Sequence, residues 1–176
     1  MIVNSKSLLE AHPIKGMLGT KVKGRETTHG LGEAGYDIRI KQEIRFFAFE
    51  REKPQVMRYD INGEDASFME RFDGRFVLAS AIEEFDMPDD LVGIVHDKST
   101  WARRGLSVFN TVIEPGWKGF LTLELVYHGQ ENLVIPAGSG IAQVIFHQTK
   151  ERIAYSGRYQ NQENQPVEAK LANGTS

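Results

Sequence analysis

The chain has 176 residues, of which 40% are hydrophobic and 26% charged, and its formal net charge is −3. This length fits one ordinary domain with a full hydrophobic core, and the slight negative charge argues against a dedicated nucleic-acid-binding protein. The lack of cysteine excludes disulfides, thiol nucleophiles and zinc sites that contain cysteine. No apolar run reaches the ~18 residues of a membrane span. We therefore expect a cytoplasmic protein with no membrane or nucleic-acid partner.

A short helix is predicted near the start of the chain, over Val3 to Ala11. Asn4 or Ser5 can cap it, because their side-chain oxygens accept hydrogen bonds from the free N–H groups of a first turn. Pro13 would stop the helix. The segment 15–34 that follows is rich in Gly and Thr and is predicted to be a loop.

The rest of the chain carries the pattern of many short strands. Tyr36, Ile38 and Ile40 alternate with polar residues, which predicts a half-buried strand. Further β-prone runs follow at a spacing of roughly 8–12 residues, with Gly- and Pro-containing turns between them. These runs are 44–49, 76–82, 92–95, 106–113, 120–127, 133–135 and 141–146. The segment 51–73 stays unassigned, and the pattern as a whole predicts a β-sandwich or barrel.

The densest polar segment is 96–105, with the sequence HDKSTWARRG. Its lysine, two hydroxyls and two arginines suit phosphate oxygens, because hydrogen bonds between charged groups are the strong ones. The alternative is a solvated basic turn. The five histidines of the chain do not have the spacing of a metal site, so we expect no catalytic zinc.

The predicted strand 120–127 places Glu124 on one face together with Phe120, Thr122 and Val126. A lone carboxylate among such neighbours is costly to desolvate, often has a raised pKa, and can then act as general acid or base. The alternative is an ordinary solvent-facing strand. Before this strand, Glu114 lies in a turn and could accept a hydrogen bond from a sugar hydroxyl, unless the turn is only a hairpin connection.

Three segments, in this order, resemble the dCTP deaminase family, the deaminating branch of the dUTPase-like trimers. They are Lys98-Ser99-Thr100-Trp101-Ala102-Arg103, Glu114-Pro115-Gly116-Trp117-Lys118-Gly119 and Thr122-Leu123-Glu124. Segments 35–39, 140–146 and 158–162 are similar to the family's N-terminal strand, a later strand and the C-terminal lid. The match covers most of the chain.

The resemblance implies an all-β fold: a dUTPase-like distorted β-barrel or jelly-roll with a short N-terminal helix. A single domain would span residues 1–176, with a flexible C-terminal lid from about residue 155. The implied activity is hydrolytic deamination of dCTP to dUTP and ammonia, as precursor supply for dTTP. The implied assembly is a homotrimer with active sites between subunits. Mg²⁺ would accompany the triphosphate, no zinc would be used, and dTTP is an expected inhibitor.

The resemblance also assigns roles to residues. Glu124 matches the catalytic glutamate, Ser99 the residue that holds the nucleophilic water, and Arg103 the arginine that orients the glutamate. The implied substrate-binding residues are Lys98, Ser99, Thr100, Arg103, Glu114, Thr122, Leu123, Glu124, Gln143, Tyr155, Arg158 and Gln162.

Three alternatives stay open. The first is a dUTP diphosphatase or a bifunctional enzyme, because Glu114 stands where such enzymes keep an acidic residue that activates water. The second is a deaminase acting on 5-modified dCTP, because Val112, Trp101 and Arg158 depart from the family pattern. The third is a catalytically silent β-barrel that binds a nucleotide as a regulator.

Overall fold

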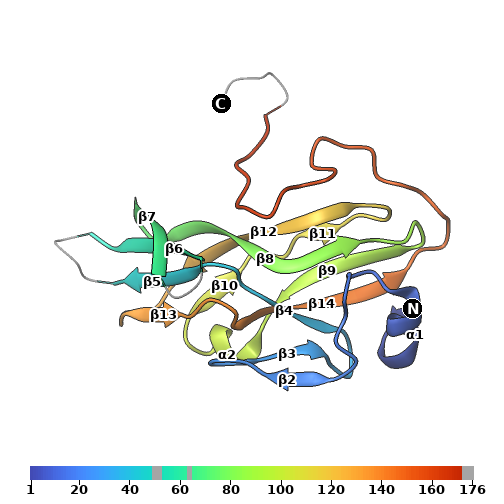
Figure 1. Cartoon of the computed structure of the whole chain (residues 1–176), viewed down its shortest axis with the longest axis horizontal. Coiled ribbons are helices and arrows are strands. Elements are labelled where there is room, and N and C mark those ends of the chain that lie inside the picture. Colours follow the sequence, from blue (N-terminus) through green and yellow to red (C-terminus); the bar gives the residue numbers. More distant parts are fainter. Residues whose placement is uncertain (49–52, 63–64, 172–176) are drawn as a thin grey trace.

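The computed structural model describes residues 1–48, 53–62 and 65–171, and these form strands with two short helices (Figure 1). The helices are α1 (Ser5–Ala11) and α2 (Ser99–Ala102). The strands are β1 (Ile2–Val3), β2 (Lys21–Lys23), β3 (Thr28–Leu31), β4 (Tyr36–Arg39), β5 (Glu43–Phe47), β6 (Gln55–Asn62), β7 (Asp65–Asp73), β8 (Phe76–Asp86), β9 (Leu91–Asp97), β10 (Leu106–Val108), β11 (Val112–Ile113), β12 (Lys118–Tyr127), β13 (Leu133–Ile135) and β14 (Gly140–Gln148). The predicted mainly β class is confirmed. Neither helix in the described part is long and apolar enough to cross a membrane.

The described strands form three sheets (Figure 1). The largest has the order β11-β9-β14-β4-β3-β2, with β1 paired to β14. The second has the order β10-β12-β8 and the third β13-β5-β6-β7. None of these sheets closes on itself within the described residues, so the expected barrel is better described as open, packed sheets.

The hydrophobic core comes from alternating strand positions, because every second side chain of a strand points to the same face. On β12, Leu123 and Leu125 are fully buried, and β8 contributes Ala79 and Phe85. Packing of these sheets fixes β8 and β12 side by side as a long antiparallel pair. This pair carries the pocket described below.

The N-terminal helix is confirmed as α1, which begins at Ser5 rather than Val3. Asn4 is the N-cap residue, but its side chain donates to the carbonyl oxygen of Glu33 (2.7 Å) and does not cap the first turn. The helix ends at His12, whose backbone is left-handed (φ 53°). The polar group at the helix start thus ties the helix to the chain that enters β4.

The predicted loop over 15–34 is wrong, because strands β2 and β3 pair there as a hairpin. Gly30, in β3, has φ +98°, and a Cβ on it would lie 2.5 Å from the carbonyl oxygen of Thr20. Glycine is therefore required at this position. The strands are only three and four residues long, so their alternation is too brief to stand out among the glycines and threonines.

The unassigned segment 51–73 contains most of the long hairpin of β6 and β7. The predicted run 106–113 is divided into β10 and β11, which pair with different sheets. The other predicted strands are confirmed, with ends shifted by a few residues. Phe49, the end of the predicted run 44–49, lies outside the described residues.

Candidate active site

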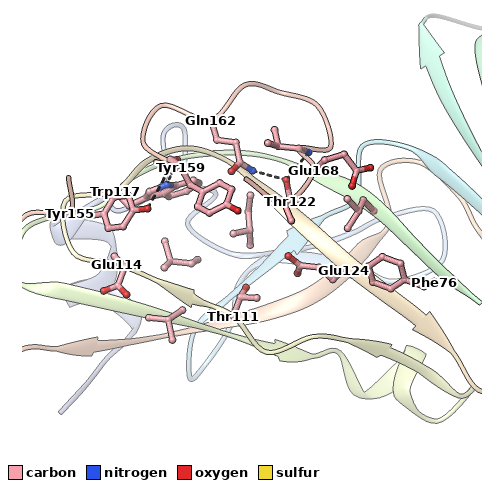
Figure 2. A pocket seen from close by; sticks show the side chains of 16 residues that line it. Phe76, Thr111, Glu114, Trp117, Thr122, Glu124, Tyr155, Tyr159, Gln162 and Glu168 are labelled. Atoms are coloured by element: carbon pink, nitrogen blue, oxygen red, sulfur yellow. Dashed lines mark hydrogen bonds between the residues drawn. The ribbon is translucent and has the colours of Figure 1, made fainter. Parts of the chain in front are cut away.

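A pocket of about 510 Å³ opens between β8, β11, β12 and the C-terminal tail (Figure 2). Most of its wall is apolar or aromatic, with a few carboxylate, hydroxyl and amide groups among these side chains. The lining residues are Phe76, Leu78, Thr111, Val112, Ile113, Glu114, Trp117, Leu121, Thr122, Glu124, Tyr155, Tyr159, Gln162, Val167, Glu168 and Ala169. The pocket therefore collects five of the residues predicted to form the site: Glu114, Thr122, Glu124, Tyr155 and Gln162.

Glu124 extends from the middle of β12 toward the pocket, directly across the ladder from Leu78 on β8 (Figure 2). Its Oε2 atom is buried and has no hydrogen-bond partner among the described residues. Burial raises the pKa of this carboxyl above its ordinary value of 4.5. A carboxyl in this environment can take up and release a proton nearer neutral pH, as a general base and acid must. This burial agrees with the desolvated carboxylate predicted on this strand face, and its catalytic role stays a prediction.

An irregularity in the β8–β12 ladder shapes the wall beside Glu124. Phe120 pairs with Glu84, but Thr122 pairs with Ser80, so the register shifts between them. Leu121 lines the pocket at this shift and is at the same time part of the buried core. Such bulges re-aim side chains and are common beside active sites.

The neighbouring residue Leu123 has a different place from that implied by the resemblance. Its side chain is fully buried in the hydrophobic core and is absent from the pocket wall. Thr122 and Glu124, one position before and after it, line the pocket. Alternation along β12 therefore leaves only the backbone of Leu123 available to that side.

Thr122 is the point where the C-terminal tail is attached to the pocket. Its Oγ1 atom accepts hydrogen bonds from Nε2 of Gln162 (2.6 Å) and from the backbone N–H of Val167 (3.1 Å), as Figure 2 shows. The tail also pairs with β12, because the N–H of Phe120 donates to the carbonyl oxygen of Gln162 (3.0 Å). At Gly119 (φ +133°) a Cβ would lie 2.5 Å from the Gln162 nitrogen, so glycine permits this close approach.

An aromatic wall of the pocket combines Trp117, directly before β12, with Tyr155 and Tyr159 of the tail (Figure 2). The indole N–H of Trp117 donates to the carbonyl oxygen of Tyr159 (2.7 Å), and the Tyr155 hydroxyl accepts from the Tyr159 N–H (3.3 Å). Glu114 is exposed at the same pocket. Arg158 lies outside the wall, and its exposed guanidinium donates to the carbonyl oxygen of Lys170.

Sequence analysis assigned no role to several lining residues, namely Phe76, Leu78, Thr111, Ile113, Trp117, Leu121, Tyr159, Val167, Glu168 and Ala169. Trp117 belongs to a segment that carries the resemblance. The others come from β8, from β11 and the residue before it, from β12 and from the tail. Their place depends on contacts between segments far apart in the chain, for which a single sequence has no local signal.

The remaining predicted site residues form a second group, at β9, α2 and β14. Ser99, Thr100 and Arg103 are exposed on or directly after α2. The Nζ atom of Lys98 lies 2.5 Å from Oδ2 of Asp37, which is almost fully buried. In Figure 1, α2 lies at the lower edge of the molecule, whereas β11, β12 and the tail lie toward the upper edge. The structure does not bring this group into the pocket of the same chain.

Gln143 belongs to the second group as well, because it lies on β14 directly opposite Asp37 on β4. It is half-buried and takes no part in the pocket wall. No group of three or more His, Cys, Asp or Glu side chains that could hold a metal ion is found in residues 1–48, 53–62 and 65–171.

Comparison with known proteins identifies the chain. A family model described as dCTP deaminase-like matches residues 9–149. The chain belongs to the dCTP deaminase family. The dCTP deaminase of Herpetosiphon aurantiacus is 34% identical over 161 residues, which cover 85% of this chain and 86% of that protein. The dCTP deaminase of Acidobacterium capsulatum is 32% identical over 179 residues, or 93% of this chain and 96% of that protein.

A solved structure shows the same fold. The 2′-deoxycytidine 5′-triphosphate deaminase from Agrobacterium tumefaciens matches with a TM-score of 0.54 and 16% identity. The match covers 82% of this chain and 47% of that chain. The mainly β architecture described above is thus also found in a structure named as a dCTP deaminase.

Proposed function

We propose that this member of the dCTP deaminase family hydrolyses the bond between C4 and the exocyclic amine of cytosine in dCTP, giving dUTP and ammonia. The observation that carries the proposal is Glu124, a half-buried carboxylate with an unpartnered oxygen and a raised pKa. It faces a pocket of about 510 Å³ with a mostly apolar wall, large enough for a pyrimidine base. Named relatives that are 32% and 34% identical over most of the chain support the choice of substrate.

Glu124 would move the protons of this reaction. Its carboxylate takes a proton from a water molecule as the water oxygen attacks C4, and passes the proton to N3 of the base. The carboxylate then takes the second proton from the new C4 hydroxyl and gives it to the amine. The C4–N bond breaks, ammonia leaves, and a carbonyl remains at C4. General acid–base catalysis of this kind contributes about 10²–10⁴-fold to a rate.

The other polar groups of the pocket would hold the nucleoside. Thr122 lies two residues from Glu124 on the same face, so its hydroxyl is placed to contact the edge of the base. Glu114 would accept a hydrogen bond from the deoxyribose hydroxyl. Tyr155 and Gln162 lie on the tail segment that lines the pocket, and they would close over the nucleotide.

We propose that Ser99, Arg103 and the adjoining Lys98 complete the pocket of a neighbouring subunit in a homotrimer. The support is that each chain holds two incomplete halves, one with the carboxylate and one with the cations. Exposed apolar side chains also border the pocket: Phe76, Phe109 and Val112 are 45–55% exposed, and the rings of the two phenylalanines lie 6.2 Å apart. A neighbouring subunit would cover this surface.

Mg²⁺ would bind with the substrate, through oxygens of the triphosphate, as it does at many nucleotide sites. The proton transfers above use side chains of the protein and require no zinc. dTTP shares the deoxyribose and triphosphate of the substrate, so we expect it to compete for the site. We expect the enzyme to be cytoplasmic and its product dUTP to serve as a precursor for dTTP synthesis.

A second activity, hydrolysis of dUTP to dUMP and pyrophosphate, is favoured by one observation. Glu114 is an exposed carboxylate at the pocket and could activate a water molecule there. Chromatography of digests of dCTP, 5-substituted dCTP analogues and dUTP separates the possibilities. Formation of dUTP and ammonia from dCTP would support the deaminase proposal. Formation of dUMP and pyrophosphate as the first products would instead support the second activity and contradict the first. Faster conversion of a 5-substituted analogue would identify a modified cytosine as the substrate.

A further inference from the structure

A row of polar residues crosses the largest sheet at one level. Lys21 on β2 lies opposite Gly30 on β3, and Gly30 lies opposite Asp37 on β4. Asp37 lies opposite Gln143 on β14, which in turn lies opposite His96 on β9. Residues directly opposite each other in an antiparallel ladder have their side chains on the same face. The row therefore brings polar side chains from four strands to one face of the sheet.

Gly30 explains how Lys21 reaches Asp37. This position has no side chain, so nothing stands between the two neighbours in the row. The Nζ atom of Lys21 lies 3.8 Å from Oδ2 of Asp37. Lys98, two residues beyond His96 and hence on the same side by alternation, places its Nζ atom 2.5 Å from the same oxygen.

The cluster holds two lysines and two carboxylates, of which only Asp37 is buried. The Asp37 side chain is only 2% exposed and is shared by two lysines, and the side chain of Lys98 is 11% exposed and that of Lys21 37%. Glu33 also approaches Lys21 (3.7 Å), but its side chain is 96% exposed, so water screens that contact. Lys21 is therefore only weakly neutralised, by a buried carboxylate that it shares with Lys98 and by a solvent-exposed one, and an anion bound beside it would be stabilised.

We propose that Lys21 is a further phosphate-binding residue, which with Lys98 forms a two-cation site for the outer phosphates of a nucleoside triphosphate. The proposal rests on the proposed function, which gives Lys98 and Ser99 to the substrate. Lys98 adjoins Ser99 in the chain and shares Asp37 with Lys21, so we expect Lys21 to meet the end of the phosphate chain. β2 is the edge strand of its sheet, which leaves Lys21 open to solvent on one side.

The test is the affinity for nucleotides of different phosphate length. Lys21→Gln should weaken dCTP binding by about tenfold, the loss expected for one hydrogen bond to a charged group. It should leave dCMP binding within about twofold, because dCMP lacks the outer phosphates. Lys21→Arg, which keeps the charge, should retain most of the affinity for dCTP. Lys23→Gln is the matched control, because it removes the same charge two residues further along β2.

Equal losses for dCTP and dCMP, no loss for either, or an equal loss in Lys23→Gln would overturn the proposal. Melting temperatures of all variants in the absence of ligand separate loss of binding from loss of folding. Inorganic tripolyphosphate is the second probe, because it needs no base pocket. If wild type binds tripolyphosphate more tightly than Lys21→Gln does, yet converts no dCTP, the two-cation site stands and the deaminase proposal falls. If wild type deaminates dCTP and both proteins bind tripolyphosphate equally, the deaminase proposal stands and the two-cation site falls.

Discussion

The pocket and the polar row use charge in opposite ways. In the pocket, Glu124 is set among apolar side chains, and one of its oxygens has no partner in the described residues. In the row, the buried carboxylate of Asp37 has two cations within 4 Å. An unpaired buried carboxylate has a raised pKa and suits proton transfer, whereas a paired one keeps cations in place. The first arrangement fits chemistry at a base, and the second fits binding of a polyphosphate.

Removing the carboxylate of the pocket is the sharpest way to separate the two regions. Glu124→Gln should lower kcat for dCTP deamination by at least roughly 10²-fold, the scale of a general acid–base contribution. dCTP binding should persist, because the polar row is untouched. Steady-state kinetics with calorimetric binding measures both. A variant with near-normal kcat would remove Glu124 from its catalytic role.

Mixed trimers test whether the two regions act on one substrate across a subunit boundary. Glu124→Gln and Arg103→Ala should each be inactive alone. Co-expressed, they should recover activity at up to about a quarter of the sites, because random assortment then joins an intact Glu124 of one subunit to an intact Arg103 of its neighbour. Assays of the co-purified protein give the result. Mixtures as inactive as the parents would mean that each site is built within a single chain.

The tail contact on Thr122 predicts a smaller effect. Thr122→Val removes the acceptor of the hydrogen bonds from Gln162 and Val167, so the tail should be held less firmly against the pocket. We expect dCTP affinity to fall by about fivefold to tenfold, in line with one or two lost hydrogen bonds. Thr149→Val is the control, since the Thr149 hydroxyl donates to the carbonyl oxygen of Glu151, away from the pocket. An equal effect in the control would show that the tail contact on Thr122 is unimportant.

Metal removal should affect the polyphosphate and spare the proton transfer. EDTA should weaken dCTP binding several-fold through loss of Mg²⁺, whereas a zinc-selective chelator should change neither binding nor kcat. Nucleotide titrations with added MgCl₂ as the rescue measure this. One zinc atom per chain by metal analysis, with activity lost on its removal, would contradict the proposed mechanism.

The smallest predicted effect is on stability. The pKa of Glu124 is raised in the folded protein, so the folded state holds this proton more tightly than the unfolded chain does. The stability that this proton adds to the folded state is complete below pH 4.5, the ordinary pKa. It is lost as pH rises through the raised pKa of the folded protein. The Glu124→Gln variant has no carboxyl to ionise at this position. The melting temperature of the variant minus that of wild type should therefore increase as the pH is raised from about 4 to about 8. A constant difference across this range would show that Glu124 is not desolvated.

The sequence predicted those parts of the molecule that depend on local pattern. Alternation along 120–127 identified both the strand and the face that carries Glu124, because burial follows a period of two residues. The β2–β3 hairpin was missed because its strands are too short for that pattern. The register shift between Phe120 and Thr122 had no signal in the sequence, because a bulge depends on the partner strand, here β8.

Contacts between distant segments account for the rest of what the sequence did not reveal. The tail reaches Thr122 across 40 positions in the case of Gln162, and Lys98 reaches Asp37 across 61. Family resemblance pointed to Gln162 and Lys98 as substrate-binding residues. The contacts that each makes became visible only in three dimensions.

The most direct test of Glu124 as the proton-transfer group is the pH dependence of kcat/KM for dCTP, measured beside an NMR titration of the Glu124 carboxyl. We expect the acid limb of the profile to lie above pH 4.5 and to coincide with the NMR titration, since the ionised carboxylate must accept the first proton. An acid limb at or below 4.5, or one that differs from the pKa of Glu124 seen by NMR, would contradict this role.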